Sequence, residues 1–319
     1  MPELKDIAYC SGFAVGQGNL LDVYVPEASR VGEVEDDDAA GPRKGPWPLV
    51  IWSQGSGWLA DNGRSTAGLV AAHLVPRGFA VAGVSVRSSA QARFPAQLDD
   101  VTAAIRHLHA HAERYGLDPE RFAIMGDSSG GWLAAMAALT VGAPGVTGHV
   151  RAAVSFYPPT DLLRMDEQMP PGALEEFTVF PGGPYGHNDP ASPESRLLGG
   201  PLQERPELAK QASPVTHVHQ EAPPFLILHG QADRIVPYGQ GRALYSALAE
   251  AGRDVTMISL PHAGHGPWND FLTDPRTKQD AFSVSSRGGR ATGDRAADPT
   301  WDTVGEFLRR NLDGPRLNT

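Results

Sequence analysis

The sequence predicts an α/β fold, built from a doubly wound, mostly parallel sheet with helices on both faces. Short apolar runs recur along the chain with the length of buried strands, and segments with helical spacing of apolar residues separate them. Strands that alternate with helices favour parallel pairing, with helices covering both sides of the sheet. A length of 319 residues is enough for one large core. We therefore expect a single domain over residues 1–319.

Each expected strand rests on a short apolar pattern. Leu21, Val23 and Val25 alternate with other residues, which predicts an edge strand that Pro26 ends. The remaining strands are continuous apolar runs, bounded by turn residues. They are expected at residues 48–52, 79–84, 121–125, 152–156, 225–229 and 255–260.

The expected helices lie between these strands and after the last one. The clearest of them is amphipathic, with Leu98, Val101, Ile105 and Leu108 along one stripe. Another is rich in alanine and directly follows a glycine-serine segment. The helices are expected at residues 65–76, 96–115, 131–139, 239–251 and 301–312.

Three stretches lack a regular pattern. Residues 157–222 are rich in Pro and Gly, and we expect an irregular, cap-like segment there. Residues 271–298 form a polar insertion without clear periodicity. We favour a flap over the site for this insertion, rather than a disordered segment, because it begins at a candidate catalytic loop. The acidic run at 33–38 is expected in a solvated loop between two early strands.

Composition excludes several classes of protein. Acidic residues outnumber basic ones by 37 to 27, a formal charge of −10, so the chain has no electrostatic footprint for nucleic acid or an anionic membrane. The single cysteine, Cys10, permits no intrachain disulfide. The first residues have neither a basic nor an apolar region, so we expect no signal peptide in this sequence, although one that was removed would leave no trace. No stretch approaches the roughly 18 apolar residues of a membrane span. We expect a cytoplasmic protein with a small-molecule partner, and allow for a homodimer.

The most informative motif is Gly-Asp-Ser-Ser-Gly at residues 126–130, between an expected strand and an expected helix. That context is typical of a nucleophile elbow, a sharp turn that lifts a serine hydroxyl clear of the sheet. A side chain at Gly126 or Gly130 would collide in such a turn. The pentapeptide alone also occurs in ordinary turns. Ser128 is therefore a candidate nucleophile for acyl transfer, and the rest of the chain has to support it.

A nucleophilic serine needs a base, and the base needs an acid that orients it. Asp233 follows one expected strand and His265 follows the last one. The chain order Ser, Asp, His is that of an α/β-hydrolase. Asp233 could instead simply cap its own turn. His262 is three residues closer to the strand, but the glycines on both sides of His265 favour His265 for the tip of a mobile loop.

An oxyanion hole needs backbone N–H donors near the nucleophile. The glycine-containing loop after the strand at 48–52 can supply one from Ser56 or Gly57, with Trp58 as a further alternative, and Ser129 can supply the other. Aromatic residues near these motifs are candidate pocket walls, although each could equally lie in the core. These substrate-binding candidates are Trp58, Tyr157 and Trp268.

Two histidines have the spacing of a metal pair. His107 and His111 are separated by one helical turn, but no third ligand is suggested nearby. A solvated helix face is the better interpretation. The expected chemistry requires no metal and no organic cofactor.

Together, these segments resemble the α/β-hydrolase superfamily, and within it the small carboxylesterases that include bifunctional acetylxylan and feruloyl esterases. The resemblance covers most of residues 15–270. It is carried by GSGW, FPAQLDDVTAAIRHL, YGLDPERFAIMGDSSGG, SPESRLLGG, and APPFLILHGQADRIVPYGQGRALYSALAEAG before PHAGHG. The resemblance implies that the nucleophile, acid and base fall on Ser128, Asp233 and His265. It also implies a substrate with short or aromatic acyl groups on sugars or phenols.

The chain departs from the family pattern in its oxyanion loop. The family usually has His-Gly-Gly-Gly-Trp there, and this chain has Gln54-Gly55-Ser56-Gly57-Trp58. Gln54 keeps hydrogen-bonding capacity, whereas Ser56 adds a side chain that either shifts the pocket or contacts substrate. The expected reaction is ester hydrolysis through an acyl-enzyme. The alternatives are an arylformamidase or amidase on the same fold, and a non-catalytic binding protein, which would normally lack a triad member.

Overall fold

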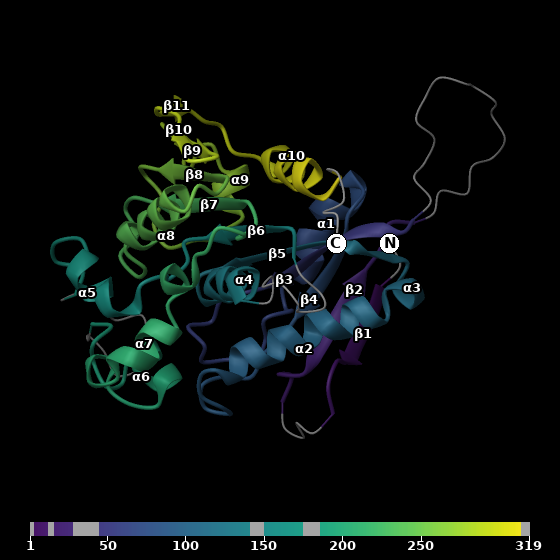
Figure 1. The fold of residues 1–319 in the computed structure, drawn as a ribbon, viewed down its shortest axis with the longest axis horizontal. Coiled ribbons are helices and arrows are strands. Elements are labelled where there is room, and N and C mark those ends of the chain that lie inside the picture. The colour runs from purple at the N-terminus through teal and green to yellow at the C-terminus, as the bar shows by residue number, and fades with distance from the viewer. Residues whose placement is uncertain (1–2, 12–15, 28–44, 141–149, 175–185, 314–319) are drawn as a thin grey trace.

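The computed structural model describes residues 3–11, 16–27, 45–140, 150–174 and 186–313, and these form one sheet with helices on both faces (Figure 1). The acidic run at 33–38 lies outside the described residues. The sheet has eleven strands in the order β1-β2-β4-β3-β5-β6-β7-β8-β9-β10, and β11 also pairs with β9. The strands are β1 Glu3–Ala8, β2 Leu20–Tyr24, β3 Trp47–Ser53, β4 Ala80–Val84, β5 Leu117–Asp127, β6 Ala152–Phe156, β7 Phe225–Gly230, β8 Val255–Leu260, β9 Phe282–Arg287, β10 Arg290–Ala291 and β11 Arg295–Ala296.

The centre of the sheet is parallel and its two ends are antiparallel. The pairs from β4 through β3, β5, β6 and β7 to β8 are all parallel. At one end β1 and β2 run antiparallel, and at the other end β9 pairs antiparallel with β8. The predicted doubly wound, mostly parallel α/β fold is confirmed. The carboxyl ends of the central strands share one edge, where such folds place their functional loops.

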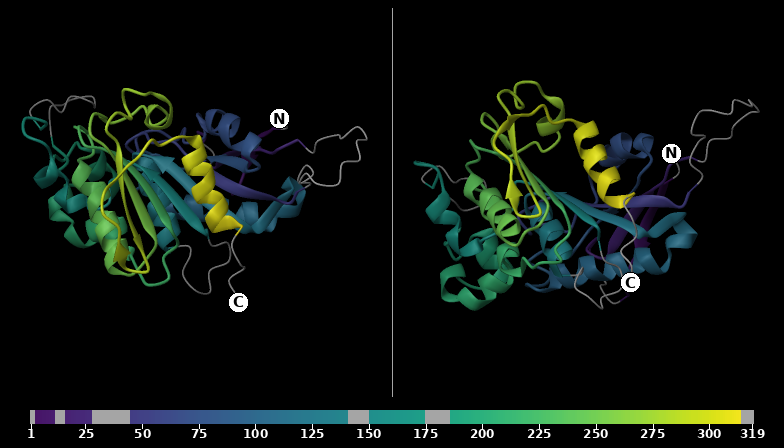
Figure 2. Two further views of the ribbon diagram at one scale, coloured as in Figure 1. Left: turned by 90° about the horizontal axis from the view of Figure 1, so that it is seen from above. Right: turned by 45° about the horizontal axis from the view of Figure 1, so that its top comes forward.

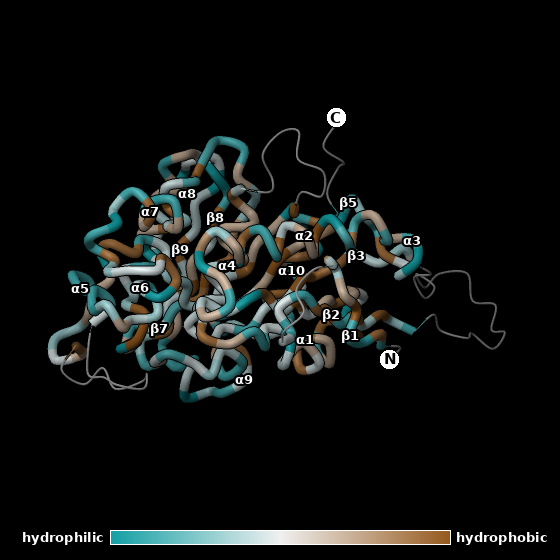
Figure 3. Tube along the Cα trace, turned by 90° about the horizontal axis from the view of Figure 1, so that it is seen from below, coloured by the Kyte–Doolittle hydropathy of each residue, from teal (hydrophilic) through white to brown (hydrophobic). Residues whose placement is uncertain are grey.

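Helices cover the two faces of the sheet according to their apolar stripes. On one face lie α2 (Ala96–Ala110), α4 (Ser129–Thr140) and α8 (Tyr238–Glu250). On the other lie α1 (Ala67–Leu74) and α10 (Trp301–Leu312), side by side (Figure 2). Successive β3 residues alternate between the two cores, so Leu49 packs on the first face and Val50 on the second. Figure 3 shows the consequence, with the most apolar stretches along the inner strands and helices and hydrophilic residues on the outer loops.

The cap-like segment at 157–222 is less irregular than its composition indicates. Its described residues contain short helices next to α8, at one end of the molecule (Figure 1). Most of them end at a glycine or shortly before a proline, which keeps them short. The α-helical pieces are α5 Met165–Gln168, α6 Pro193–Leu198 and α7 Pro206–Gln211, and the 3₁₀ pieces are Leu162–Arg164, Leu202–Glu204 and Pro214–His217.

Two sequence predictions about the sheet are wrong. The strand at 21–25 is not an edge strand, because β1 pairs along its outer side. The insertion at 271–298 is neither a flap nor disordered. After the short helix α9 (Asp270–Thr273), it extends the sheet through β9, β10 and β11. The open edge of β8 offers unpaired backbone groups, and β9 satisfies them. β9 is half exposed, so it needs no apolar run that sequence inspection could detect.

The expected helix at 96–115 is broken near its end. α2 ends at Ala110, and a separate turn, α3 (Ala112–Tyr115), follows His111. A 3₁₀ turn (Val75–Arg77) similarly follows α1. The last helix matches its prediction at both ends, because Thr300 and Thr303 form a reciprocal capping box that fixes where it starts.

Candidate active site

Ser128 lies at the turn between β5 and α4, at the carboxyl edge of the sheet. Its φ of +52° is a left-handed conformation that a non-glycine residue adopts only where the surroundings enforce it. The glycines on both sides make the turn possible. A Cβ on Gly126 would meet the backbone of Gly130, and a Cβ on Gly130 would meet the backbone of Ser53. This is the predicted elbow, and the Ser128 side chain is only partly covered.

The structure brings the three predicted residues into one hydrogen-bonded chain. His265 Nε2 lies 2.9 Å from Ser128 Oγ, and His265 Nδ1 lies 2.8 Å from Asp233 Oδ2. Asp233 is buried, whereas the His265 side chain is 15% exposed and so reaches solvent. The residues come from three loops, each following a central strand. The arrangement meets the distance requirement for a serine, a base and an orienting acid.

Asp233 performs both roles that the sequence left open. Its Oδ1 accepts the N–H groups of Ile235 and Val236, each at 2.9 Å, so it caps its own turn. Its Oδ2 holds His265. Burial disfavours the ionised carboxyl, but the adjacent His265 and His229 outweigh burial and hold the pKa of Asp233 below its usual range. The carboxylate is therefore charged at neutral pH and fixed in orientation.

His229 and His262 occupy very different positions. His229 is fully buried, with Nε2 3.0 Å from the Val236 carbonyl oxygen and 3.5 Å from Asp233 Oδ2. It lies close to the same carboxylate oxygen that holds His265, a contact that sequence reasoning missed. His262 is exposed and lies 3.0 Å from Asp280 Oδ2. Of the two candidate bases, only His265 contacts Ser128 in the described structure.

Asp127, directly before the nucleophile, is a further residue that sequence reasoning missed. Its buried carboxylate accepts the Gly55 N–H at 3.0 Å and lies 3.4 Å from the Tyr157 hydroxyl. The Tyr157 ring in turn packs against the His265 ring, with centroids 4.5 Å apart. Burial raises the pKa of Asp127 to about 6, against a smaller opposing effect of these hydrogen bonds and of His265. Asp127 thus connects Gly55 in the oxyanion loop with Tyr157, the residue that packs against His265.

The structure narrows the choice among the oxyanion donors. The Ser56 N–H donates to Ser129 Oγ at 2.9 Å, and the Trp58 N–H approaches the same oxygen at 3.4 Å. Within the described residues the Gly57 N–H makes no hydrogen bond. The Ser129 N–H lies in the first turn of α4, where helices leave N–H groups unpaired. Gly57 and Ser129 remain candidate donors, whereas the prediction of a free Ser56 amide is wrong because Ser129 Oγ accepts it.

The two unusual side chains of the oxyanion loop bond to the protein itself. The Ser56 hydroxyl donates to the Ala60 carbonyl oxygen at 3.1 Å. It therefore closes the loop, which accounts for it without a substrate contact. Gln54 Oε1 accepts the Ser65 hydroxyl at 2.9 Å, so it does use the hydrogen-bonding capacity that the sequence indicated.

The three aromatic residues considered as pocket walls pack in different places. Trp268 packs in the core against Trp52, with ring centroids 4.6 Å apart, which favours the core position that the sequence left open as its alternative. Tyr157 is buried beneath His265 and supports it instead of forming an open wall. Trp58 is also mostly buried, edge-on against Trp132 at 5.4 Å, and it lines a small cavity behind the oxyanion loop.

His107 on α2 and His111, which follows its last residue, contact each other and Tyr115. The rings of His107 and His111 stack with centroids 4.3 Å apart, and His107 Nε2 lies 3.0 Å from the Tyr115 hydroxyl. Across the described part of the chain, no group of three or more His, Cys, Asp or Glu side chains is arranged to hold a metal ion. In the same residues no helix combines the length and apolarity that crossing a membrane requires.

A parallel sheet, a serine elbow after its central strand, and a histidine and an aspartate on later strand ends define the α/β-hydrolase fold class. Within that class the chain belongs to the BD-FAE family, whose sequence model matches residues 39–248.

Relatives in sequence and structure agree with this placement. The chain is 32% identical over 304 residues to Esterase LipQ of Mycobacterium tuberculosis, covering 92% of this chain and 63% of LipQ. It is 30% identical over 245 residues to the probable carboxylic ester hydrolase LipM of the same organism, covering 74% and 53%. The chain thus spans less than two thirds of these relatives. A solved structure, a truncated carbohydrate esterase from gut microbiota, superposes with a TM-score of 0.69 and 30% identity, over 84% of this chain and 90% of that one.

Proposed function

We propose that the protein is a serine carboxylesterase in which Ser128 is the nucleophile, His265 the general base and Asp233 the orienting acid. The observation that carries the proposal is the continuous hydrogen-bonded chain from Ser128 Oγ through His265 to Asp233, with separations of 2.9 Å and 2.8 Å. The esterase relatives supply the reaction class, since fold alone does not.

The reaction proceeds in two halves. Ser128 attacks the ester carbonyl while His265 Nε2 takes its proton, and the charged Asp233 stabilises the imidazolium that forms. His265 then gives the proton to the leaving alcohol, which departs and leaves an acyl-enzyme. A water molecule, deprotonated by His265, attacks the acyl carbonyl, and Ser128 leaves as it recovers its proton. No step requires a metal or an organic cofactor.

The tetrahedral intermediates need hydrogen bonds to their oxyanion. We assign these to the N–H groups of Gly57 and Ser129, each worth about 3 kcal/mol of transition-state stabilisation. Gly57 and Trp58 both have left-handed backbone, with φ of +58° and +57°. Two consecutive residues of this kind turn the loop sharply, which supports an amide directed out of the loop and toward the nucleophile.

We infer that the substrates are small esters with short or aromatic acyl groups. The names of the relatives and the carbohydrate esterase among the solved structures support ester substrates, and the motif resemblance to acetylxylan and feruloyl esterases supports short or aromatic acyl groups. An acidic chain with a net charge of −10 favours a small-molecule partner over nucleic acid or an anionic membrane. We also propose a cytoplasmic location, since a chain with one cysteine does not depend on an oxidising compartment.

The test is hydrolysis of 4-nitrophenyl esters from acetate to decanoate by the native protein and by three variants. Ser128→Ala and His265→Ala should lose nearly all activity. His262→Ala is the matched control, because His262 lies three residues from His265 but pairs with the exposed Asp280, and it should stay near native. Equal losses in the two histidine variants would contradict the assignment of the base. A native protein that hydrolyses amides and no ester would contradict the reaction class.

A further inference from the structure

A groove of about 610 Å³ opens beside the oxyanion loop, and the proposed mechanism does not use it. One wall is the segment at 89–93, and the other is formed by Pro190 and the end of α6. Leu59, two residues after the proposed oxyanion donor Gly57, also lines the groove. We refer to this feature, lined by Leu59, residues 89–93, Pro190, Ser195, Arg196, Gly199 and Gly200, as the arginine groove.

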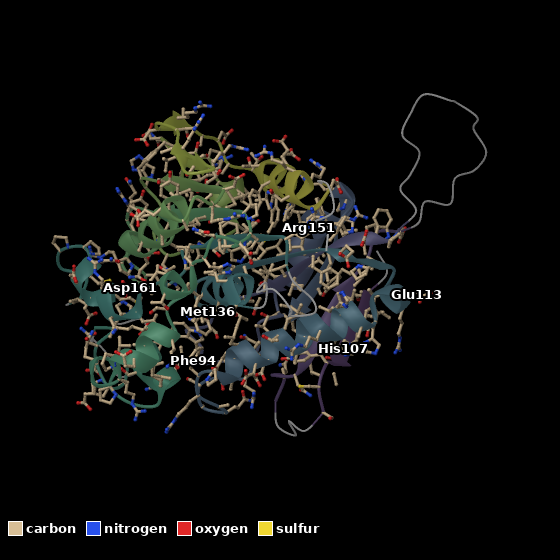
Figure 4. All side chains as sticks on the ribbon, viewed as in Figure 1. Phe94, His107, Glu113, Met136, Arg151 and Asp161 are labelled. Carbon is tan, nitrogen blue, oxygen red and sulfur yellow. The ribbon has the colours of Figure 1, made fainter. Side chains whose placement is uncertain are left out.

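Backbone hydrogen bonds fasten both walls of the arginine groove to the catalytic region. The Ser89 N–H donates to the Trp58 carbonyl oxygen at 2.7 Å, and the Phe94 N–H donates to the Leu197 carbonyl oxygen at 2.9 Å. Phe94 lies beside the segment that carries α6 and α7, as Figure 4 shows, and its ring packs on Trp132 at 6.2 Å. The groove is therefore held in a fixed position next to the site.

The charge in the arginine groove is positive and unbalanced. Its charged lining residues are Arg93 and Arg196, both exposed, and neither guanidinium group forms an ion pair or a hydrogen bond within the described residues. The acidic neighbour of Pro190 in sequence, Asp189, accepts the Ala191 N–H instead. Other arginines of this acidic protein do have carboxylate partners, for example Arg87, which binds Asp100 with its guanidinium. An unpaired guanidinium pair beside a reaction centre attracts anions.

Two glycines make room for the guanidinium groups. A Cβ on Gly199 would come within 2.7 Å of Arg93 Cζ, and a Cβ on Gly200 would come within 2.7 Å of Arg205 Nη2. Gly199 also has a φ of +75°, which favours glycine at the end of α6. Arg205, like the other two, has no ion-pair partner in the part of the chain that the structure describes. The guanidinium of Arg205 is thus a third positive charge, next to the groove residue Gly200.

We propose that the arginine groove is a subsite for a carboxylate carried by the ester substrate. The proposal rests on the esterase function proposed above, and it narrows the substrate class to acidic esters. Planar guanidinium groups bind carboxylates through paired, charge-assisted hydrogen bonds. The carboxylate belongs either to the acyl group or to the alcohol, and the two sources can be distinguished by experiment.

The test compares kcat/KM for two pairs of esters that differ in one charge. For the acyl side the pair is 4-nitrophenyl hemiadipate and 4-nitrophenyl hexanoate. For the alcohol side it is 4-acetoxybenzoate and its methyl ester. The enzymes are the native protein, the double variant Arg93→Gln with Arg196→Gln, and the control Arg164→Gln. The control removes another exposed arginine, which lies in the cap-like segment with Arg196 but pairs with Glu167.

The double variant should lose about tenfold or more in kcat/KM for the charged member of one pair, and less than about twofold for the neutral member. The pair that responds shows which side of the ester carries the carboxylate. Arg164→Gln should change the two members of each pair equally. If the double variant also affects charged and neutral esters equally in both pairs, the proposal is overturned.

A binding measurement separates this proposal from the proposed reaction. Calorimetric titration of adipate and of 4-hydroxybenzoate into Ser128→Ala should detect binding of one of them, and adding the two arginine substitutions should abolish it. That outcome supports the groove even if no ester is hydrolysed. Absence of binding by both anions overturns the proposal, as equal kinetic effects do, and either result leaves the triad assignment intact.

Discussion

Asp127 lowers the stability of the folded protein at neutral pH, and Asp127→Asn should relieve that cost. Its pKa rises from the ordinary 3.8 to about 6, chiefly through burial. An acid with a higher pKa in the folded than in the unfolded chain binds its proton more tightly when folded. Stability is therefore lost as the pH rises from about 4 to about 6, and the full difference corresponds to about 3 kcal/mol.

The effect is measured as a difference between two proteins at two pH values. Between about pH 4.5 and about pH 8 the native protein should lose about 2 kcal/mol of unfolding free energy relative to Asp127→Asn. Urea unfolding followed by tryptophan fluorescence supplies the four free energies, and the subtraction removes the contributions of all other titrating groups. Asparagine keeps an oxygen that can accept the Gly55 N–H, so the local fold is preserved. Parallel pH profiles for the two proteins would refute this reasoning.

Three further predictions follow from particular contacts. Asp233→Asn should lower kcat by about 10⁴-fold in the 4-nitrophenyl acetate assay, since it removes the acceptor that orients His265; a tenfold loss would mean that His265 is held by other groups. Gly55→Ala should lower kcat about a hundredfold, because the new Cβ would lie 2.5 Å from the Asp127 carbonyl oxygen and displace the oxyanion loop; unchanged kinetics with unchanged unfolding would disprove this. Leu308→Ala, in the buried face of α10, should cost about 2–5 kcal/mol in urea unfolding, with the activity of the folded fraction retained.

The three residues of the proposed triad could be placed at one site from the sequence because each has a local signature. Gly126 and Gly130 permit the strained turn, and the neighbouring strand and helix patterns specify which serine occupies it. Asp233 and His265 follow separate apolar strands, and parallel strands bring their carboxyl ends to one edge. The contact between Ser128 and His265, 137 residues apart, follows from topology without any knowledge of side-chain packing.

Features that depend on side-chain packing could not be predicted in this way. Sequence patterns made Trp268 a candidate pocket wall, but its ring packs against Trp52 in the core. Nothing in the motif shows that Asp127 would accept a hydrogen bond from Gly55, 72 residues earlier. The loop sequence made the Ser56 amide a candidate oxyanion donor, but in the structure this amide donates its hydrogen bond to Ser129 Oγ.

The sequence by itself determined the fold class, the order of the central elements and the three residues proposed as the triad. These depend on apolar periodicity, glycine sterics and chain order, all of which act over short segments. Only the tertiary structure decided how β9 completes the sheet, which amides stay free, and that Arg93 and Arg196 share a groove. Those features arise where segments distant in the chain meet, and the pattern within either segment does not specify its partner.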